Sequence, residues 1–207
     1  AAMNLILEFQ DDMPTFGILK HNNACGFSTR DTIKKAYEAA LAGDPVSAFG
    51  GVLVSNRPID SSTADLINDL FCEVVIAPDY DSDGLAVLKS KKNRIILVSK
   101  SLERSKKLVR TALNGFLVQD RDELTETKEN LNCVTKESTS ANDISDLLFA
   151  NKISKHTKSN TIVLAKNNQL LASGTGQTSR VDALRQAIHK AKSFDFDGNP
   201  GKYPIFF

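Results

Sequence analysis

A lysine and a histidine stand side by side at the end of a short apolar run near the beginning of the chain. The run, residues 16–19, is typical of a strand buried on both faces, and Lys20 and His21 follow it directly. Ligand-binding groups converge at strand ends in α/β sheets. The pair would place an ammonium beside an imidazole, whose ordinary pKa of about 6.5 suits proton transfer near neutral pH. An isolated pair of this kind is more often a solvated strand end followed by a turn residue.

A second motif favours the functional interpretation. Residues 44–51 read Asp-Pro-Val-Ser-Ala-Phe-Gly-Gly and precede another short apolar run at 52–54. Gly50 could let a ligand pass close to the main chain, because glycine has no side chain to obstruct it. The two glycines could also simply begin the next strand. Two such loops beside similar strands indicate a binding site without identifying its ligand.

The two motifs, KHNNACG at 20–26 and DPVSAFGG at 44–51, carry a family resemblance. Together they resemble the transformylase domain of the bifunctional 5-aminoimidazole-4-carboxamide ribonucleotide (AICAR) transformylase/IMP cyclohydrolase family. The usual form of the first motif is KHxNPCG, so Ala24 stands where a proline is usual, whereas the second motif matches throughout. Further signatures follow in the family's order at residues 73–78, 114–119, 159–160 and 174–180.

The resemblance implies formyl transfer from 10-formyltetrahydrofolate to the 5-amino group of AICAR. This amine is a poor nucleophile, because its lone pair is delocalised into the imidazole ring and the carboxamide. The reaction therefore needs a proton acceptor, a proton donor and a group that stabilises the tetrahedral oxyanion. His21 matches the family's proton-accepting histidine, and Lys20 matches the lysine that stabilises the transition state.

Binding roles follow from the same resemblance. It implies substrate-binding roles for Asn23, Ser47, Phe49, Gly50, Glu73 and Asn160, and folate-binding roles for Arg180 and Val181. Without it, Glu73 and Asn160 would pass as residues at the beginning of strands, and the loop before Arg180 lacks the lysine of a P-loop. The family also implies a structural potassium ion near residues 155–160, and no catalytic metal. His156 and His189 stand in no motif, and we expect both to face solvent.

Composition limits the other possibilities. The chain has 207 residues, 41% hydrophobic and 25% charged, with a net charge of +1, so nothing points to a nucleic-acid or membrane partner. No apolar run is long enough for a membrane helix. The three cysteines, Cys25, Cys72 and Cys133, form no CxxC pair, which indicates reduced thiols in a cytoplasmic protein. Another α/β enzyme, a zinc deaminase, would need such a cysteine pair to bind its metal.

Apolar strands alternate with helices along the chain, which predicts an α/β fold of layered α/β/α sheets. The resemblance implies two subdomains like the cytidine deaminases, and we place them at residues 1–125 and 126–207. The pattern predicts helices at 2–9, 31–41, 61–70, 83–89, 141–152 and 181–192, and strands at 15–19, 52–54, 74–77, 94–98, 107–112, 116–119, 161–165 and 169–172. Residues 20–26 are predicted to form a loop. Position 29 or 31 should cap the second helix and position 61 or 62 the third. The helix at 141–152 should direct Ile144, Leu147, Leu148 and Ile153 inward.

The resemblance covers only the middle of a transformylase domain. In the family, the segments that complete the nucleotide site lie before the part that matches residue 1 and after the part that matches residue 192. We therefore expect this chain alone to be a poor catalyst and the assembly to be a homodimer, since two subunits complete each site in the family. The alternative is a catalytically silent homologue that serves as a nucleotide-binding or assembly module.

Overall fold

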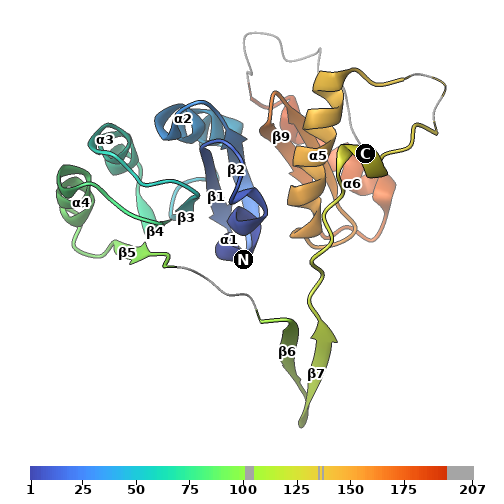
Figure 1. Ribbon diagram of the computed structural model, residues 1–207, viewed down its shortest axis with the longest axis horizontal. Coiled ribbons are helices and arrows are strands. Elements are labelled where there is room, and N and C mark those ends of the chain that lie inside the picture. Colours follow the sequence, from blue (N-terminus) through green and yellow to red (C-terminus); the bar gives the residue numbers. More distant parts are fainter. Residues whose placement is uncertain (101–104, 135, 137, 195–207) are drawn as a thin grey trace.

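A seven-stranded mixed sheet forms the middle layer of the protein (Figure 1). The computed structural model describes residues 1–100, 105–134, 136 and 138–194. The strands stand in the order β5-β4-β3-β1-β2-β9-β8, and only β3, β4 and β5 are parallel. In chain order the strands are β1 (Thr15–Lys20), β2 (Asn23–Thr29), β3 (Gly51–Ser55), β4 (Cys72–Ala77), β5 (Ile95–Val98), β8 (Ile162–Lys166) and β9 (Gln169–Gly174).

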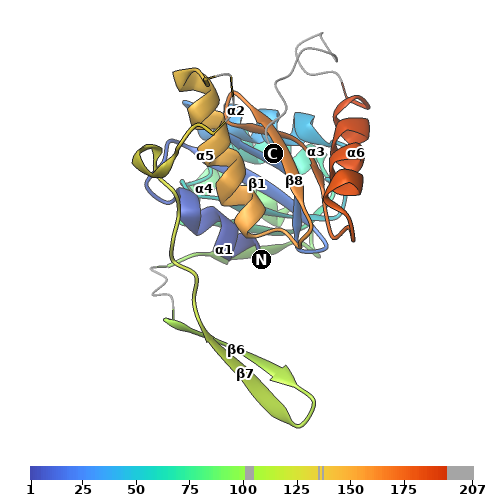
Figure 2. The same ribbon diagram turned by 90° about the vertical axis from the view of Figure 1, so that its right-hand side faces the viewer.

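Helices cover both faces of this sheet, because alternate residues of each strand point to opposite sides (Figures 1 and 2). One face packs through Ile18 and Leu53 against α2 (Ile33–Gly43), α3 (Ser61–Asp69) and α4 (Ser82–Lys89). The other face packs around the rings of Phe9, Phe27 and Phe149 against α1 (Ala2–Ile6), its following turn (Leu7–Phe9) and α5 (Ala141–Lys155). The last helix, α6 (Arg180–Ala191), packs on β8 and β9. The predicted α/β/α architecture is confirmed.

Within the residues that the structure describes, no helix is both long and apolar enough to cross a membrane.

Residues 20–26 form a tight hairpin, so the predicted loop is wrong. Lys20 pairs with Asn23, and the chain continues from there as β2. His21 and Asn22 form the turn, with φ angles of 49° and 68°. Two consecutive positive φ angles produce a turn whose twist matches that of the flanking strands. The prediction missed β2 because asparagine and glycine, which open this segment, are uncommon in strands.

Some details of the helices also differ from the prediction. Thr32 caps α2 and Asp60 caps α3, each by accepting a hydrogen bond from a backbone N–H three residues further on. The predicted caps at 29 or 31 and at 61 or 62 are wrong, since the capping residue is the one immediately before the first helical residue. In α5, Ile153 is buried as predicted, but the other inward residues are Asp146, Phe149 and Ala150, and Ile144, Leu147 and Leu148 are only half-buried.

Strand pairing continues across the predicted subdomain boundary at residues 125 and 126. β9 pairs with β2 at a single position, Ser28 with Gln169. The division into two subdomains stays a prediction, and residues 195–207 of the second one lie outside the described residues.

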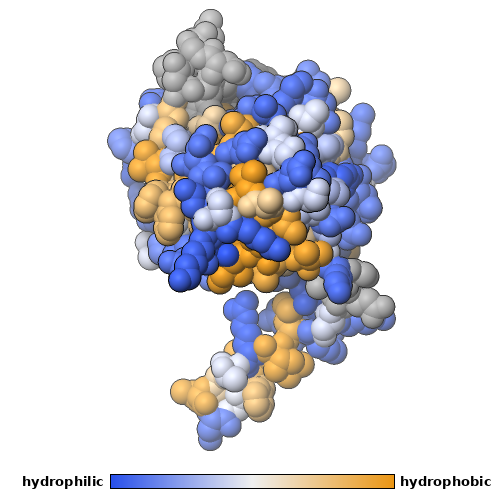
Figure 3. All heavy atoms as spheres, turned by 90° about the vertical axis from the view of Figure 1, so that its left-hand side faces the viewer, coloured by the Kyte–Doolittle hydropathy of each residue, from blue (hydrophilic) through white to orange (hydrophobic). Residues whose placement is uncertain are grey.

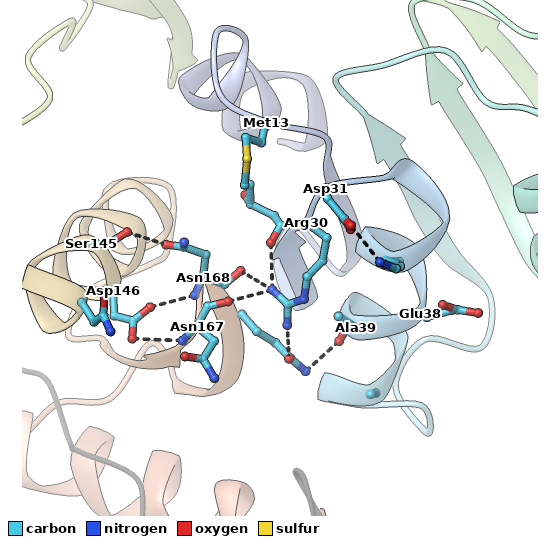
Figure 4. A pocket seen from close by; sticks show the side chains of 14 residues that line it. Met13, Arg30, Asp31, Glu38, Ala39, Ser145, Asp146, Asn167 and Asn168 are labelled. Carbon is cyan, nitrogen blue, oxygen red and sulfur yellow. Dashed lines mark hydrogen bonds and ion pairs between the residues drawn. The ribbon is translucent and has the colours of Figure 1, made fainter.

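A polar clamp fixes this junction of the sheet (Figure 4). The Arg30 guanidinium donates to the carbonyl oxygen of Asn167 (2.7 Å) and to the side-chain oxygen of Gln169 (2.6 Å). On the other side of the same turn, the Asp146 carboxylate accepts from the backbone N–H groups of Asn167 (2.9 Å) and Asn168 (2.7 Å). These bonds explain why Asp146 faces inward at only 4% exposure. The turn of the β8–β9 hairpin is therefore held from both sides.

A second hairpin stands apart from the main sheet. Among the described residues, β6 (Lys107–Ala112) and β7 (Gly115–Asp120) pair only with each other, and they project from the body (Figures 1 and 2). The two strands lie at or close to the predicted positions, 107–112 and 116–119. Phe116, Leu117 and Val118 are all more than 60% exposed, and the projecting part carries a hydrophobic surface (Figure 3). A two-stranded hairpin is only marginally stable in water by itself.

Replacing Asp146 with alanine should lower the free energy of unfolding by about 2–4 kcal/mol, because the backbone N–H groups of Asn167 and Asn168 would lose their charged acceptor. Urea unfolding followed by circular dichroism measures the change. Ser145→Ala is the matched control, since Ser145 is exposed and meets only the Asn168 side chain, at 3.1 Å, in the same region. Equal unfolding free energies for the two variants would contradict the clamp.

Candidate active site

The two motifs found in the sequence meet at one cavity. It has a volume of about 270 Å³ and is lined by Lys20, His21 and Asn23 from the β1–β2 hairpin and by Ser47 from the second motif. Ala24 and Cys25 of β2 and Leu170, Ala172 and Ser173 of β9 contribute its walls. The cavity lies there because β2 and β9 pair only at Ser28 and Gln169 and separate toward the hairpin turn.

The tight turn presents the first motif to this cavity. His21 is exposed, and its carbonyl oxygen accepts a hydrogen bond from the Asn23 side chain at 3.2 Å. Lys20, the last residue of β1, is half-buried. Strand pairing between Lys20 and Asn23 fixes the turn, so the ammonium and the imidazole come from adjacent residues of a rigid hairpin.

The second motif forms a sequence of tight turns between α2 and β3. Asp44 begins it, and the Asp44 carboxylate accepts from the backbone N–H of Ser47 at 2.9 Å. Gly50 has a φ angle of 68°, a conformation that favours glycine, and its N–H donates to the carbonyl oxygen of Phe71 at 2.7 Å. The Phe49 ring lies 4.9 Å from the Phe71 ring, between centroids. The loop is therefore anchored at both its beginning and its end.

A direct hydrogen bond joins the two motifs. The Lys20 ammonium donates to the carbonyl oxygen of Phe49. A Cβ atom added to Gly50 would lie 3.0 Å from that ammonium, which is tighter than ordinary contact. Gly50 is thus required both by its φ angle and by the approach of Lys20. A protonated lysine has three N–H donors, so two remain for a ligand.

Other predicted site residues lie outside the cavity wall. Glu73 is exposed at the beginning of β4, and Arg180 and Val181 are exposed at the beginning of α6. The Asn160 side chain donates to the carbonyl oxygens of Gln177 (3.1 Å) and Thr178, and so supports the loop before α6. The structure therefore gathers Lys20, His21, Asn23, Ser47, Phe49 and Gly50, and leaves Glu73, Asn160, Arg180 and Val181 around this group.

Sequence reasoning missed the contribution of α6. Gln186 and Lys190 line the cavity from this helix, and Lys190 forms an ion pair with buried Asp44. The two residues are four positions apart and so share one face of the helix. That spacing is visible in the sequence, but nothing in it shows that this face lies opposite the second motif.

Cys25 also lines the cavity, although it matches no catalytic position of the family. Burial and the negative charge of Asp44 raise its pKa to about 11, and Lys190 offsets this only in part. Its thiol donates to the carbonyl oxygen of Ile18 at 3.4 Å. Cys25 is therefore a protonated thiol at neutral pH and not a nucleophile.

A buried charge cluster lies at the end of α5, where the predicted potassium ion would be. The Glu8 carboxylate contacts His156 (3.0 Å), Thr125 (2.8 Å) and Lys155 (3.4 Å). Burial alone would raise the pKa of Glu8, but these hydrogen bonds and the charge of Lys155 outweigh it and lower the pKa to about 2. His156 is thus a hydrogen-bond partner of Glu8, and the prediction that it faces solvent is wrong.

The described residues of this segment form hydrogen bonds and ion pairs with their surroundings. Their carboxylate neighbour, Glu8, is already paired, and the carbonyl oxygens of Lys158 and Asn160 accept from the N–H groups of Gly176 and Gln177. Within the described ranges, no three histidine, cysteine or acidic side chains gather as metal ligands either. The potassium ion stays a prediction.

A larger cavity, of about 890 Å³, lies at the Arg30–Asp146 clamp and not at the motifs (Figure 4). Most of its charged groups have partners: Arg30 and Asp146 hold the Asn167–Asn168 turn, and Asp31 pairs with Lys35 at 2.7 Å. It is lined by none of the predicted site residues, so the smaller cavity is the candidate site.

Comparisons with known proteins agree with the motifs. Residues 1–190 match the family described as the AICARFT/IMPCHase bienzyme. The chain is 60% identical over 199 residues to the bifunctional purine biosynthesis protein PurH of Bacteroides thetaiotaomicron, which covers 96% of this chain and 39% of that protein. It is 44% identical to the proteins of the same name from Chlorobium phaeobacteroides and Aquifex aeolicus, over 96% and 95% of this chain and 38% of each relative. The chain spans about two fifths of the length of these relatives.

The Cys25 thiol should resist alkylation near neutral pH. With a pKa of about 11 it should react at least roughly tenfold more slowly at pH 8 than an ordinary exposed cysteine, whose pKa is about 8.5, because far less thiolate is present. Mass spectrometry of the iodoacetamide-treated native chain measures the rates, with exposed Cys133 as the internal reference. Labelling of Cys25 as fast as Cys133 would show that the cavity wall does not suppress its ionisation.

Proposed function

Because this chain belongs to the AICARFT/IMPCHase bienzyme family, we propose that it carries part of a site for formyl transfer in purine (IMP) biosynthesis. The donor would be 10-formyltetrahydrofolate and the acceptor the 5-amino group of AICAR. The observation that supports this most directly is the meeting of the two motifs: the Lys20 ammonium bonds to the Phe49 carbonyl oxygen, beside His21 and Ser47 at one cavity.

In the proposed reaction, the amino nitrogen of AICAR attacks the formyl carbon and forms a C–N bond. The formyl oxygen becomes an oxyanion, and the bond from carbon to the folate nitrogen then breaks. His21, exposed at the turn, would accept the proton from the attacking nitrogen. Lys20 would stabilise the oxyanion and supply a proton to the departing nitrogen. Its bond to Phe49 holds the ammonium in place before substrate arrives.

The remaining roles are proposed from the family. Asn23 and Ser47 would contact AICAR from the cavity wall, and the backbone at Phe49 and Gly50 would contact it beside Lys20. Glu73 and Asn160 would add hydrogen bonds to AICAR, and Arg180 and Val181 would contact the folate. All four residues lie around the cavity and not in its wall.

We further propose a homodimer in the cytoplasm. The projecting β6–β7 hairpin supports a subunit contact, because Phe116, Leu117 and Val118 expose apolar side chains that the described chain does not cover. Exposed apolar patches of this kind mark interaction sites in soluble proteins.

Replacing His21 with alanine should lower formyl-transfer turnover by about 10²- to 10⁴-fold, because general-base catalysis is lost. Lys20→Met should lower it by about 10²- to 10³-fold through loss of oxyanion stabilisation. Release of tetrahydrofolate measures turnover, and calorimetry measures AICAR binding. Lys89→Met, at an exposed lysine in the last turn of α4, is the control and should leave both unchanged.

The same measurements distinguish a transformylase from a catalytically silent nucleotide-binding module. Turnover that depends on both residues supports the transformylase. AICAR binding without any turnover in the unmodified chain supports a silent nucleotide-binding module. Turnover unaffected by either substitution would overturn the roles given to Lys20 and His21.

The hairpin should contribute to the dimer interface. Phe116→Asp should raise the dimer dissociation constant at least about tenfold, because a charge would replace a buried ring. Sedimentation equilibrium measures the constant. Asn93→Asp adds the same charge at an exposed position outside the hairpin and serves as the control. An unchanged constant for Phe116→Asp would place the subunit contact elsewhere.

A further inference from the structure

The loop that carries Ser47, Phe49 and Gly50 begins at a buried carboxylate. The Asp44 side chain is only 1% exposed, and its charge is balanced by the ammonium of Lys190 from α6. A buried carboxylate is costly unless it is paired and hydrogen-bonded. The position of Asp44 is therefore tied to that of α6.

Asp44 in turn determines the path of the loop. One carboxylate oxygen contacts Lys190, and the other accepts from the Ser47 N–H at 2.9 Å. The Asp44 carbonyl oxygen accepts from the N–H of Ala48 at 3.2 Å, and the carbonyl oxygen of Ala48 accepts from Gly51 at 3.0 Å. Each turn of the loop is thus hydrogen-bonded, directly or through one residue, to Asp44.

The end of this path is the Phe49 carbonyl oxygen, which holds the Lys20 ammonium. A chain of contacts therefore runs from α6 through Asp44 and the loop to the group proposed to stabilise the oxyanion. Lys190 lines the same cavity, and its ammonium is paired with the Asp44 carboxylate.

We propose that Lys190 is a positioning residue for the formyl transfer proposed above. By holding Asp44, it sets the loop of residues 44–50 at the position where the Phe49 carbonyl oxygen meets the Lys20 ammonium. The proposal rests on the proposed function for its catalytic consequence. Its structural part, the coupling of α6 to the loop, stands on the contacts alone.

Four variants of the 207-residue chain test this role. Lys190→Met removes the ammonium, and Lys190→Arg keeps a cation that could reach Asp44. The double variant Asp44→Asn with Lys190→Met removes both charges, so it tests the tether without leaving a buried carboxylate unpaired. Lys192→Met, at an exposed lysine two residues further on, is the matched control. Hydrogen exchange of residues 44–51 and calorimetric titration with AICAR are the two measurements.

We expect Lys190→Met and the double variant to exchange residues 44–51 at least about tenfold faster, with the rest of the sheet unchanged. AICAR should bind them about tenfold more weakly, whereas Lys190→Arg and Lys192→Met should resemble the unmodified chain. The double variant should be more stable than Lys190→Met, because it leaves no unpaired buried carboxylate. If its residues 44–51 still exchange fast, the loop depends on the tether to Lys190 and not only on the balance of charge.

Two results would overturn the inference. In the first, residues 44–51 keep their protection in the folded double variant. In the second, Lys190→Arg fails to restore it although the variant is folded. Failure of the unmodified chain to bind AICAR would count against the proposed function instead, because the exchange measurement needs no ligand.

Discussion

The candidate site depends on where β2 and β9 pair and where they separate. They pair at Ser28 and Gln169, next to the turn that Arg30 and Asp146 hold from two sides. Toward the other end of the sheet they diverge, and the space between them becomes the cavity. A pair of strands bonded along its whole length would leave no such space. A structural clamp at one end of the sheet thus permits an open site at the other.

The same arrangement of helix, hairpin and helix occurs twice in the chain, although the sequence shows no evident repeat. α1, β1, β2 and α2 form the first unit, and α5, β8, β9 and α6 the second. Each hairpin turns through two residues with positive φ, at 21–22 and at 167–168. Each also carries a glycine, Gly26 or Gly174, where a Cβ atom would lie within 2.0 Å of a helix carbonyl oxygen, so the helix can approach the strand closely. One turn presents the ammonium and the imidazole, whereas the other is occupied by the clamp.

Local pattern was enough to predict most of the fold, and the family motifs were enough to locate the cavity. Apolar runs such as 52–54 and 161–165 lie close to the observed strands, because fully buried strands are continuously apolar. β2 was missed because its first residues favour turns, and pairing on both sides stabilises the strand nevertheless. Asp146 on the inner face of α5 and Lys190 opposite Asp44 could not be predicted, since each is explained only by a partner brought near by tertiary structure.

The division of chemistry within the cavity also follows from tertiary contacts. Cys25 and His21 line the same space, but Cys25 is largely enclosed and lies near the charge of Asp44, which raises its pKa to about 11. His21 stands exposed at the turn, where solvent and substrate can reach its ring. Burial is the main cause of this rise in the Cys25 pKa, and the carboxylate that organises the second motif adds to it. In the proposed reaction this leaves the imidazole as the proton acceptor, and it explains why a cysteine within the cavity does not compete for that role.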